Sequence, residues 1–381
     1  MSVGDVAAAV HESGHAAAVH QSSLVPQRSW ISLLGVPGLV LLQVLAYSSQ
    51  SLLITASKSE ATGVYAYDTS LAVLIAEVFK LLAVLVAESR TQKLQSSTTW
   101  KHFFSDPLSL AIPAVLYAVH NNLVFAAHVY LPAPTYQLLH KMKIIITGIV
   151  YRVLLQRRLL VIQWIALLQL GIGLAVTALS ASCPSSFHPA GISQCWLTWL
   201  KGATVMVSLS VCSALAGVHI ELLRASRSKS HEEPQAPSQV QICSYGVLAS
   251  AIGVALTARE EGRPLLHGYT PAVWAVVLAN SFLGVLVSIV FKHGSNQVKL
   301  VGANLTVLVT AAASSQLFSF QPPASWWLGY SLVACSLCLY YGEEHILYST
   351  DSIWLPFTKR SYFLRQKSED LELELGYPKL V

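Results

Sequence analysis

Long apolar runs recur along the whole chain, each about as long as a helix needs to cross the hydrocarbon core of a bilayer. They lie near residues 31–55, 69–88, 107–128, 133–154, 159–180, 199–222, 240–258, 272–291, 301–320 and 324–342. Charged residues make up 11% of the chain, against about 25% in a typical soluble domain. Because so few charges cannot cover a water-facing surface of this size, the sequence predicts an all-α membrane protein with ten transmembrane helices.

The connections between these runs alternate in their basic content. Lysine and arginine gather in 89–106, 152–158, 223–239 and 343–381. They are absent from the alternate connections 129–132, 181–198 and 321–323. The other two alternate connections, 56–68 and 259–271, carry only Lys58, Arg259 and Arg263. Since basic loops remain on the cytosolic side of a membrane, this alternation predicts an even number of spans with both ends in the cytosol.

Four charged residues inside the runs need a reason to be there, because a charge in a membrane span is costly. Glu77 and Lys80 lie three residues apart and therefore share a helix face. They either neutralise each other or leave Lys80 to face a polar cavity. Lys143 has no acidic neighbour within a turn, so it is expected to bind an anion such as a phosphate. Its neighbour Lys141 either joins it or extends towards the membrane surface.

The third run carries a cluster of polar and aromatic side chains, formed by Tyr117, His120, Asn121 and Asn122. Tyr117 and Asn121 lie four residues apart, on one helix face. One interpretation is hydrogen bonding between helices. The other is that Tyr117 stacks on a planar ring while an asparagine contacts the edge of that ring.

A second basic cluster stands at the entrance to the ninth run, where Lys292, Asn296 and Lys299 are spaced as on a helix. It is either an ordinary basic flank of a span or a second cationic patch of a binding site. Cations, amides and aromatics from separate spans together predict an anionic ligand that contains a ring. Basic residues interleaved with aromatics are missing outside the apolar runs, so nucleic acid is not an expected partner.

Several strings in the chain resemble those of nucleotide-sugar transporters, in the branch with CMP-sialic acid, UDP-galactose and UDP-N-acetylglucosamine carriers. The resemblance runs in order from about residue 30 to 342. It is carried by A-E-V-F-K at 76–80, L-Y-A-V-H-N-N-L at 116–123, P-T-Y-Q-L-L-H-K-M-K-I at 134–144, Q-W-I-A at 163–166, S-A-L-A-G-V-H-I-E at 213–221, F-K-H-G-S-N-Q-V-K at 291–299 and L-Y-Y-G at 339–342.

This resemblance implies ten helices in two inverted five-helix halves, 30–181 and 199–342, joined by a lumenal loop at 182–198. Residues 1–29 and 343–381 are then cytosolic tails. It also implies the exchange of a cytosolic nucleotide sugar for a lumenal nucleoside monophosphate, without a cofactor and without enzymatic activity. The expected location is the Golgi membrane, with the endoplasmic reticulum as the alternative. The resemblance is also compatible with homo-oligomers of the chain and with hetero-oligomers that contain glycosyltransferases.

The resemblance also implies a substrate site. Its expected residues are Lys80, Tyr117, Asn121, Asn122, Tyr136, Lys143, Ser213, Gln241 and Lys299. Lys143 and Lys299 are expected to hold phosphate, and Tyr117 and Asn121 to lie near the pyrimidine.

The chain departs from the family at the entrance to the seventh span. An Arg-Asn-x-Gln block, with a tyrosine close behind, is common there, whereas this chain has Ser-Gln-Val-Gln-Ile-Cys at 238–243. The asparagine and tyrosine that contact the base in the family are therefore missing, and Gln241 is the residue that remains for this role. K-H-G-S at 292–295 and L-Y-Y-G at 339–342 resemble a UDP-sugar subgroup, so a UDP-sugar is expected rather than CMP-sialic acid. Because this block is altered, a second hypothesis stays open: the chain is a family member that has lost transport and serves as a scaffold.

The strongest enzymatic alternative is H-E-S-G-H at 11–15, which fits the H-E-x-x-H pattern of zinc proteases. In that pattern His11 and His15 bind zinc and Glu12 is the general base. A catalytic zinc needs a third protein ligand and a shaped pocket. The motif lies ahead of the first apolar run, and no acidic third-ligand motif follows it. The sequence therefore predicts neither an enzyme nor a metal site.

Overall fold

The computed structural model describes residues 30–59, 62–90, 107–154, 159–182, 189–228, 239–257, 264–293 and 296–341. Within these ranges the regular structure is helical, and none of it is a strand. The helices are α2 (Trp30–Ala56), α3 (Thr69–Arg90), α5 (Pro107–Tyr130), α6 (Ala133–Leu139), α7 (Met142–Leu154), α8 (Val161–Ser182), α9 (Pro189–Ser228), α10 (Gln239–Thr257), α11 (Pro271–His293), α12 (Asn296–Phe318) and α13 (Ala324–Tyr341). Seven of them are long and apolar enough to cross a membrane. The prediction of an all-α membrane protein is thereby confirmed.

Every predicted apolar run falls on a described helix, but two details differ. The fourth run is broken into α6 and α7, whose backbone turns at His140 and Lys141. The amides of Lys141 and Ile144 bond to carbonyls three residues back, at 3.1 Å and 2.9 Å, as in a tight 3₁₀ turn. The other difference is α9, which begins at Pro189 inside the segment expected as a loop. Its apolar part, Leu200–Leu223, coincides with the predicted sixth span.

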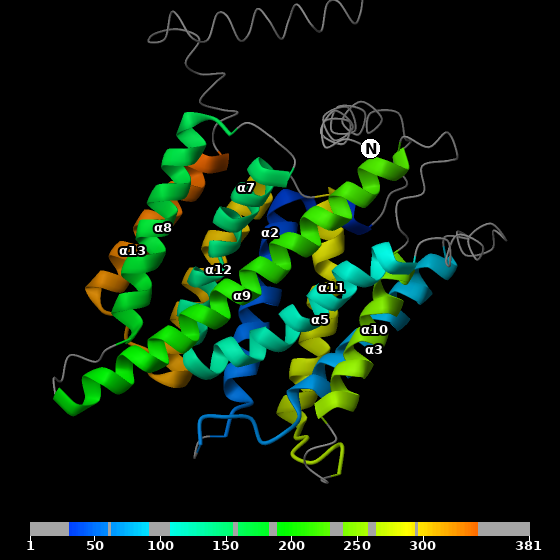
Figure 1. Cartoon of the computed structure of the whole chain (residues 1–381), viewed down its shortest axis with the longest axis horizontal. Helices are drawn as coiled ribbons and strands as arrows, with labels where there is room; N and C mark the ends of the chain where they lie inside the picture. The colour runs from blue at the N-terminus through cyan, green and yellow to red at the C-terminus, as the bar shows by residue number, and fades with distance from the viewer. Residues whose placement is uncertain are drawn as a thin grey trace, which may run out of the picture.

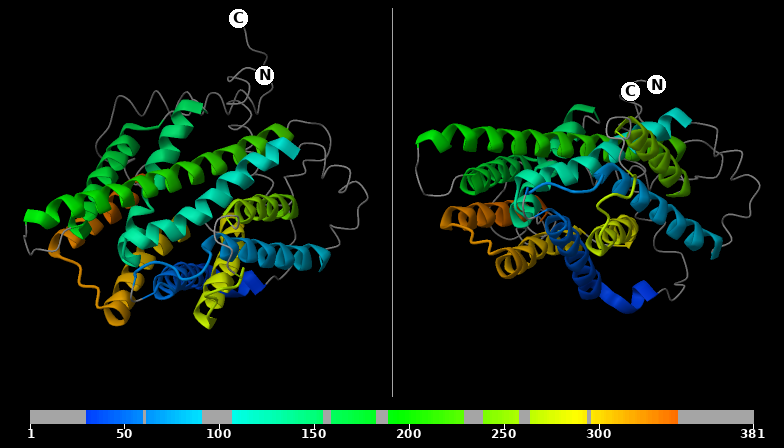
Figure 2. Two further views of the ribbon diagram at one scale, coloured as in Figure 1. Left: turned by 60° about the horizontal axis from the view of Figure 1, so that its bottom comes forward. Right: turned by 90° about the horizontal axis from the view of Figure 1, so that it is seen from below.

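Helices that are distant in the sequence lie side by side in the bundle (Figures 1 and 2). The principal pairs are α8 with α13, α5 with α9, α3 with α10, and α2 with α12. Small polar residues join α2 to α12, because the Thr310 hydroxyl donates to Ser48 Oγ at 3.0 Å. Many leucine, isoleucine and valine side chains point outward. Apolar outer faces with small polar contacts between helices are typical of packing in lipid.

Helices α8 and α13 pack closely around two glycines, Gly173 and Gly329. A Cβ at Gly329 would overlap the Thr177 hydroxyl and lie 2.8 Å from the Gly173 carbonyl oxygen. Since backbone atoms cannot yield as a flexible side chain can, we expect Gly329→Ala to destabilise the protein by about 1–3 kcal/mol. Thermal unfolding of the purified protein in detergent measures the loss. Gly217→Ala is the matched control, because a Cβ there meets no atom within 4 Å. Equal melting temperatures for the two variants would contradict the prediction.

The loops after α2 and before α11 meet at one end of the bundle, at the bottom of Figure 1. The Tyr269 hydroxyl donates to the Asp68 carbonyl oxygen at 3.2 Å, and the rings of Tyr67 and Tyr269 lie 5.6 Å apart. Tyr65 extends this tyrosine cluster, with its ring 5.5 Å from Tyr67. Burial raises the pKa of Tyr67 to about 12, and burial likewise lowers the pKa of Lys58 in the same loop. The cluster therefore closes this end with contacts between the two parts of the chain.

Candidate functional site

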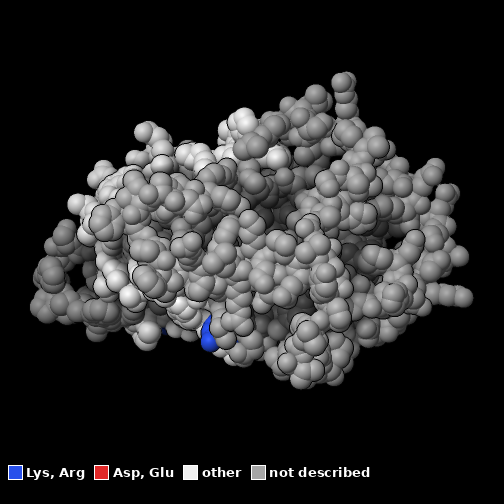
Figure 3. All heavy atoms as spheres, turned by 90° about the horizontal axis from the view of Figure 1, so that it is seen from above, with Lys and Arg blue, Asp and Glu red and all other residues white. Residues whose placement is uncertain are grey.

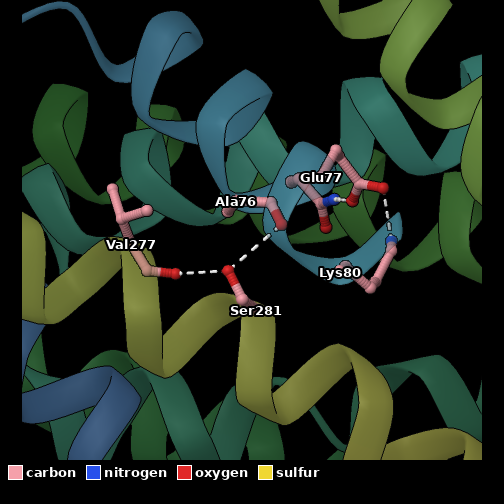
Figure 4. Close-up of polar contacts among 6 residues, drawn as sticks. Ala76, Glu77, Lys80, Val277 and Ser281 are labelled. Carbon is pink, nitrogen blue, oxygen red and sulfur yellow. Dashed lines mark hydrogen bonds and ion pairs between the residues drawn. The ribbon is translucent and has the colours of Figure 1, made fainter. Parts of the chain in front are cut away.

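A charged network links α3 to α5 in the middle of the bundle (Figure 4). Lys80 and Glu77 form an ion pair across one turn of α3, as their spacing predicted. The Asn121 amide donates to the other carboxylate oxygen of Glu77 at 3.0 Å. Beside this pair, Ser281 of α11 donates to the Ala76 carbonyl oxygen of α3 at 3.1 Å. The Glu77 carboxylate thus neutralises the Lys80 ammonium group and accepts a hydrogen bond from the Asn121 amide. One-fifth of the Lys80 side chain remains exposed.

Two glycines make room for this ion pair. A Cβ at Gly246 of α10 would lie 2.8 Å from Glu77 Oε2, and one at Gly284 of α11 would lie 2.7 Å from Lys80 Cδ. The backbones of both helices therefore pass directly over the two charged side chains. The role of these glycines was not predictable from the sequence, because a glycine in an apolar run gives no sign of which side chain of another helix packs against it.

Asn122 faces a different neighbour from Asn121. Its amide nitrogen donates to the Ala118 carbonyl oxygen at 2.9 Å, and its carbonyl oxygen accepts from the Ser70 hydroxyl at 3.0 Å. Asn122 therefore joins α5 to α3, which is the interpretation of hydrogen bonding between helices. Tyr117 lies one turn before Asn121 on α5 and is partly buried.

The other expected residues are spread over three helices. Ser213 of α9 and Gln241 of α10 are buried. Lys299 lies on α12, but its side chain is outside the described part, and so are His11, Glu12 and His15. Among the described residues, His, Cys, Asp and Glu nowhere gather as a group of three or more able to hold a metal ion.

Aromatic rings line up from α5 to the break between α6 and α7. Tyr136 lies with its ring 4.1 Å from that of His128 and 5.7 Å from that of His140, and His140 lies 6.2 Å from His120. We call these four residues the ring column. A carbonyl can only accept, so His128 Nδ1 donates to Val124 O at 2.8 Å. Nε2 of the neutral ring then accepts from the Ser51 hydroxyl at 2.8 Å.

Of the ring column, only Tyr136 and His120 were predicted from the sequence. His128 and His140 were not, because each contributes through contacts with another helix or with the helix break. Pro134 explains why α6 begins as a separate helix, since proline is favoured in a first helical turn but cannot continue a longer helix from α5.

Lys143 lies in the first turn of α7, two residues after the turn at His140 and Lys141. Its side chain is partly buried. Within the described part of the chain it has no carboxylate partner. The bundle therefore holds an ammonium group that no described carboxylate compensates, as an anion site requires.

A sequence model for one family, described as nucleotide-sugar transporter, matches residues 33–341, which include the ten described helices from α3 to α13 and most of α2. The chain belongs to the nucleotide-sugar transporter family. The transporter is 31% identical over 337 residues to CMP-sialic acid transporter 1 of Arabidopsis thaliana. The matched region is 85% of this chain and 93% of the relative. It is 29% identical over 350 residues to the UDP-galactose translocator of Homo sapiens, over 88% of this chain and 82% of the relative.

One solved crystal structure resembles the transporter in fold, with a TM-score of 0.50 at 15% identity. The likeness covers 81% of this chain and 97% of that structure. The curated relatives are transporters rather than enzymes, which agrees with the absence of enzymatic activity expected from the sequence.

Proposed function

We propose that this transporter is an antiporter of the Golgi membrane that exchanges a cytosolic pyrimidine nucleotide sugar, preferably a UDP-sugar, for a lumenal nucleoside monophosphate. The observation that carries the proposal is Lys143, a partly buried ammonium group beside a broken helix, without a counter-ion among the described residues. Broken helices with a ligand site at the break are a recurring device of transporters. The cargo's phosphate is the anion that Lys143 needs.

The proposal includes ten spans in two inverted halves, 30–181 and 199–342. If α2 to α8 correspond in order to α9 to α13, with α6 and α7 as one span, the packing of the bundle is symmetric. The contact of α2 with α12 matches that of α9 with α7, and the contact of α5 with α9 matches that of α11 with α2. Corresponding helices α3 and α10 pack together, and so do α8 and α13. Such pairing supports a two-fold relation between the halves.

The same packing suggests how access alternates. Both parts of the broken span pack against the second half, α6 against α12 and α7 against α9. The tyrosine cluster closes the end of the bundle that lies at the bottom of Figure 1. Helices α7 and α9, each followed by a basic connection in the sequence, end towards the top of Figure 1, and one small basic area is visible among the described atoms seen from that side in Figure 3. By the positive-inside rule this end is cytosolic, which supports a state closed on the lumenal side.

The preference for uracil over cytosine has support from Asn121. Its amide nitrogen is engaged by Glu77, and its carbonyl oxygen has no described partner. A free carbonyl oxygen accepts a hydrogen bond from a ring N–H, which uracil has and cytosine lacks. Tyr117 lies one turn away on the same face, where it can stack on the base. Lys80, Tyr136, Ser213, Gln241 and Lys299 complete the proposed site.

The test is uptake by proteoliposomes that contain the purified full-length transporter. Vesicles are loaded with UMP or CMP and offered labelled UDP-sugars and CMP-sialic acid. We expect UMP-loaded vesicles to accumulate a UDP-sugar, and empty vesicles or CMP-loaded vesicles to accumulate less. Uptake of CMP-sialic acid alone would contradict the UDP-sugar preference. The absence of uptake for every pair would instead favour a scaffold, for instance one that associates with itself or with glycosyltransferases.

A further inference from the structure

Lys58, in the connection between α2 and α3, binds the end of α5. This α2–α3 connection is described at 57–59 and 62–68. The Lys58 ammonium group donates to the His128 carbonyl oxygen at 2.7 Å, two residues before α5 ends. The helical partner of that carbonyl would be the amide of Pro132, which has no N–H. Lys58 therefore supplies a donor that the helix lacks, at the negative end of the helix dipole.

The α2–α3 connection keeps its shape through hydrogen bonds within itself. The Ser59 amide donates to the Val64 carbonyl oxygen at 2.9 Å, and the Gly63 amide donates to the Ser59 carbonyl oxygen at 2.8 Å. The hydroxyl groups of Ser57 and Tyr67 share a hydrogen bond of 2.9 Å. None of these bonds depends on α5, so the connection can leave α5 and keep its own structure.

Two further hydrogen bonds hold the connection in place. The Tyr65 hydroxyl donates to the Phe125 carbonyl oxygen of α5 at 3.1 Å. The Tyr269 hydroxyl donates to the Asp68 carbonyl oxygen at 3.2 Å, from the connection that precedes α11 and is described at 264–270. The acceptors are backbone carbonyls, as at Lys58. Because water can replace such partners at little net cost, these bonds are suited to a contact that breaks and re-forms.

His128 links this contact to the proposed site. Its carbonyl oxygen accepts the bond from Lys58, while its ring lies 4.1 Å from the ring of Tyr136. The same ring bonds the Ser51 hydroxyl of α2 at 2.8 Å. A displacement of α5 at His128 therefore changes the contact with Lys58 and the packing of Tyr136 together.

We propose that Lys58 is the latch of a lumenal gate, which holds the α2–α3 connection against α5 and couples its closure to Tyr136 through His128. The gate closes the end of the bundle at the bottom of Figure 1 while cargo enters from the other end. Release of Lys58 opens this end. The inference rests on the proposed function, because it takes this end of the transporter as lumenal.

The test measures the distance between the two connections. Val64 and Leu265 are exposed, one in each connection, so a spin label on a cysteine at either position stays clear of the bonds described above. The labelled full-length transporter, with its native cysteines replaced by serine, is studied by pulsed electron paramagnetic resonance. We expect one short distance for the transporter that retains Lys58, and an additional longer distance for Lys58→Met. Loss of one charge-assisted hydrogen bond shifts the ratio of open to closed gate by about tenfold.

Three variants complete the test. Lys201→Met removes an exposed lysine of α9 and should leave the distances unchanged. Tyr269→Phe removes only a hydroxyl, covers the case in which Lys58→Met does not fold, and should raise the longer distance by roughly threefold. Tyr136→Leu removes the ring that packs on His128, and should also raise the longer distance, although it lies outside the gate.

The outcomes separate the latch from the proposed function. Unchanged distances in Lys58→Met and Tyr269→Phe would overturn the latch, and unchanged distances in Tyr136→Leu would overturn its coupling to the site. If the distances shift as expected but the wild-type protein exchanges no nucleotide, the latch is supported and the proposed function is contradicted.

Discussion

Lys143→Ala is expected to abolish exchange by the reconstituted transporter while leaving its insertion in the membrane intact. Removing one partner of a buried charged contact costs about 2–5 kcal/mol, which lowers ligand affinity by about thirtyfold to several thousandfold. The fold does not depend on the ammonium group, because Lys143 has no described ion pair that its loss would break. Initial uptake rates in UMP-loaded proteoliposomes measure the effect.

Lys201→Ala serves as the control for Lys143→Ala, since it removes an exposed lysine from α9. The control is expected to transport at the wild-type rate. Wild-type uptake by Lys143→Ala would show that the phosphate is held elsewhere in the bundle, and the proposed site would then be wrong.

Glu77→Leu is expected to produce the largest loss of stability. The change leaves Lys80 charged and unpaired beneath Gly284, and deprives the Asn121 amide of its acceptor. Breaking a buried ion pair on one side destabilises a protein by about 3–5 kcal/mol. We expect a lower melting temperature in detergent and a smaller monodisperse peak on gel filtration.

The double variant Glu77→Leu, Lys80→Met separates the two roles of Lys80. Replacing both members of a buried pair by apolar residues is often nearly neutral for stability. The melting temperature should therefore recover, whereas transport should remain low if Lys80 contacts cargo. Full recovery of transport would show that Lys80 serves only to pair with Glu77. If the melting temperature does not recover, the loss of stability in Glu77→Leu comes from altered packing rather than from the unpaired charge of Lys80.

Local spacing made part of the site predictable. The pairing of Glu77 with Lys80 follows from residues three apart on a helix, and the lack of a partner for Lys143 follows from the apolar run after it. The family resemblance supplied Tyr136 and Ser213. The ten apolar runs likewise fall on described helices, because hydropathy is a local property.

Contacts across helices were not predictable in this way. The ring column depends on His128 of α5 meeting Tyr136 of α6, and nothing in either run indicates that meeting. The room that Gly246 and Gly284 leave for the ion pair depends on α10 and α11 crossing α3 at those residues. The bond between Asn122 and Ser70 was likewise not predictable, because it depends on α5 meeting α3 at those residues.

The unpaired Lys143 at the helix break has an electrical consequence. Moving one elementary charge across a membrane potential of 100 mV is worth about 2.3 kcal/mol. A UDP-sugar carries a negative charge on each phosphate, and a phosphate monoester carries nearly two at pH 7. The two proposed cargoes therefore carry nearly equal charge, so their exchange moves little net charge. We expect exchange to draw little current and to depend little on the membrane potential, whereas an empty carrier would return with the charge of Lys143 uncompensated and therefore slowly.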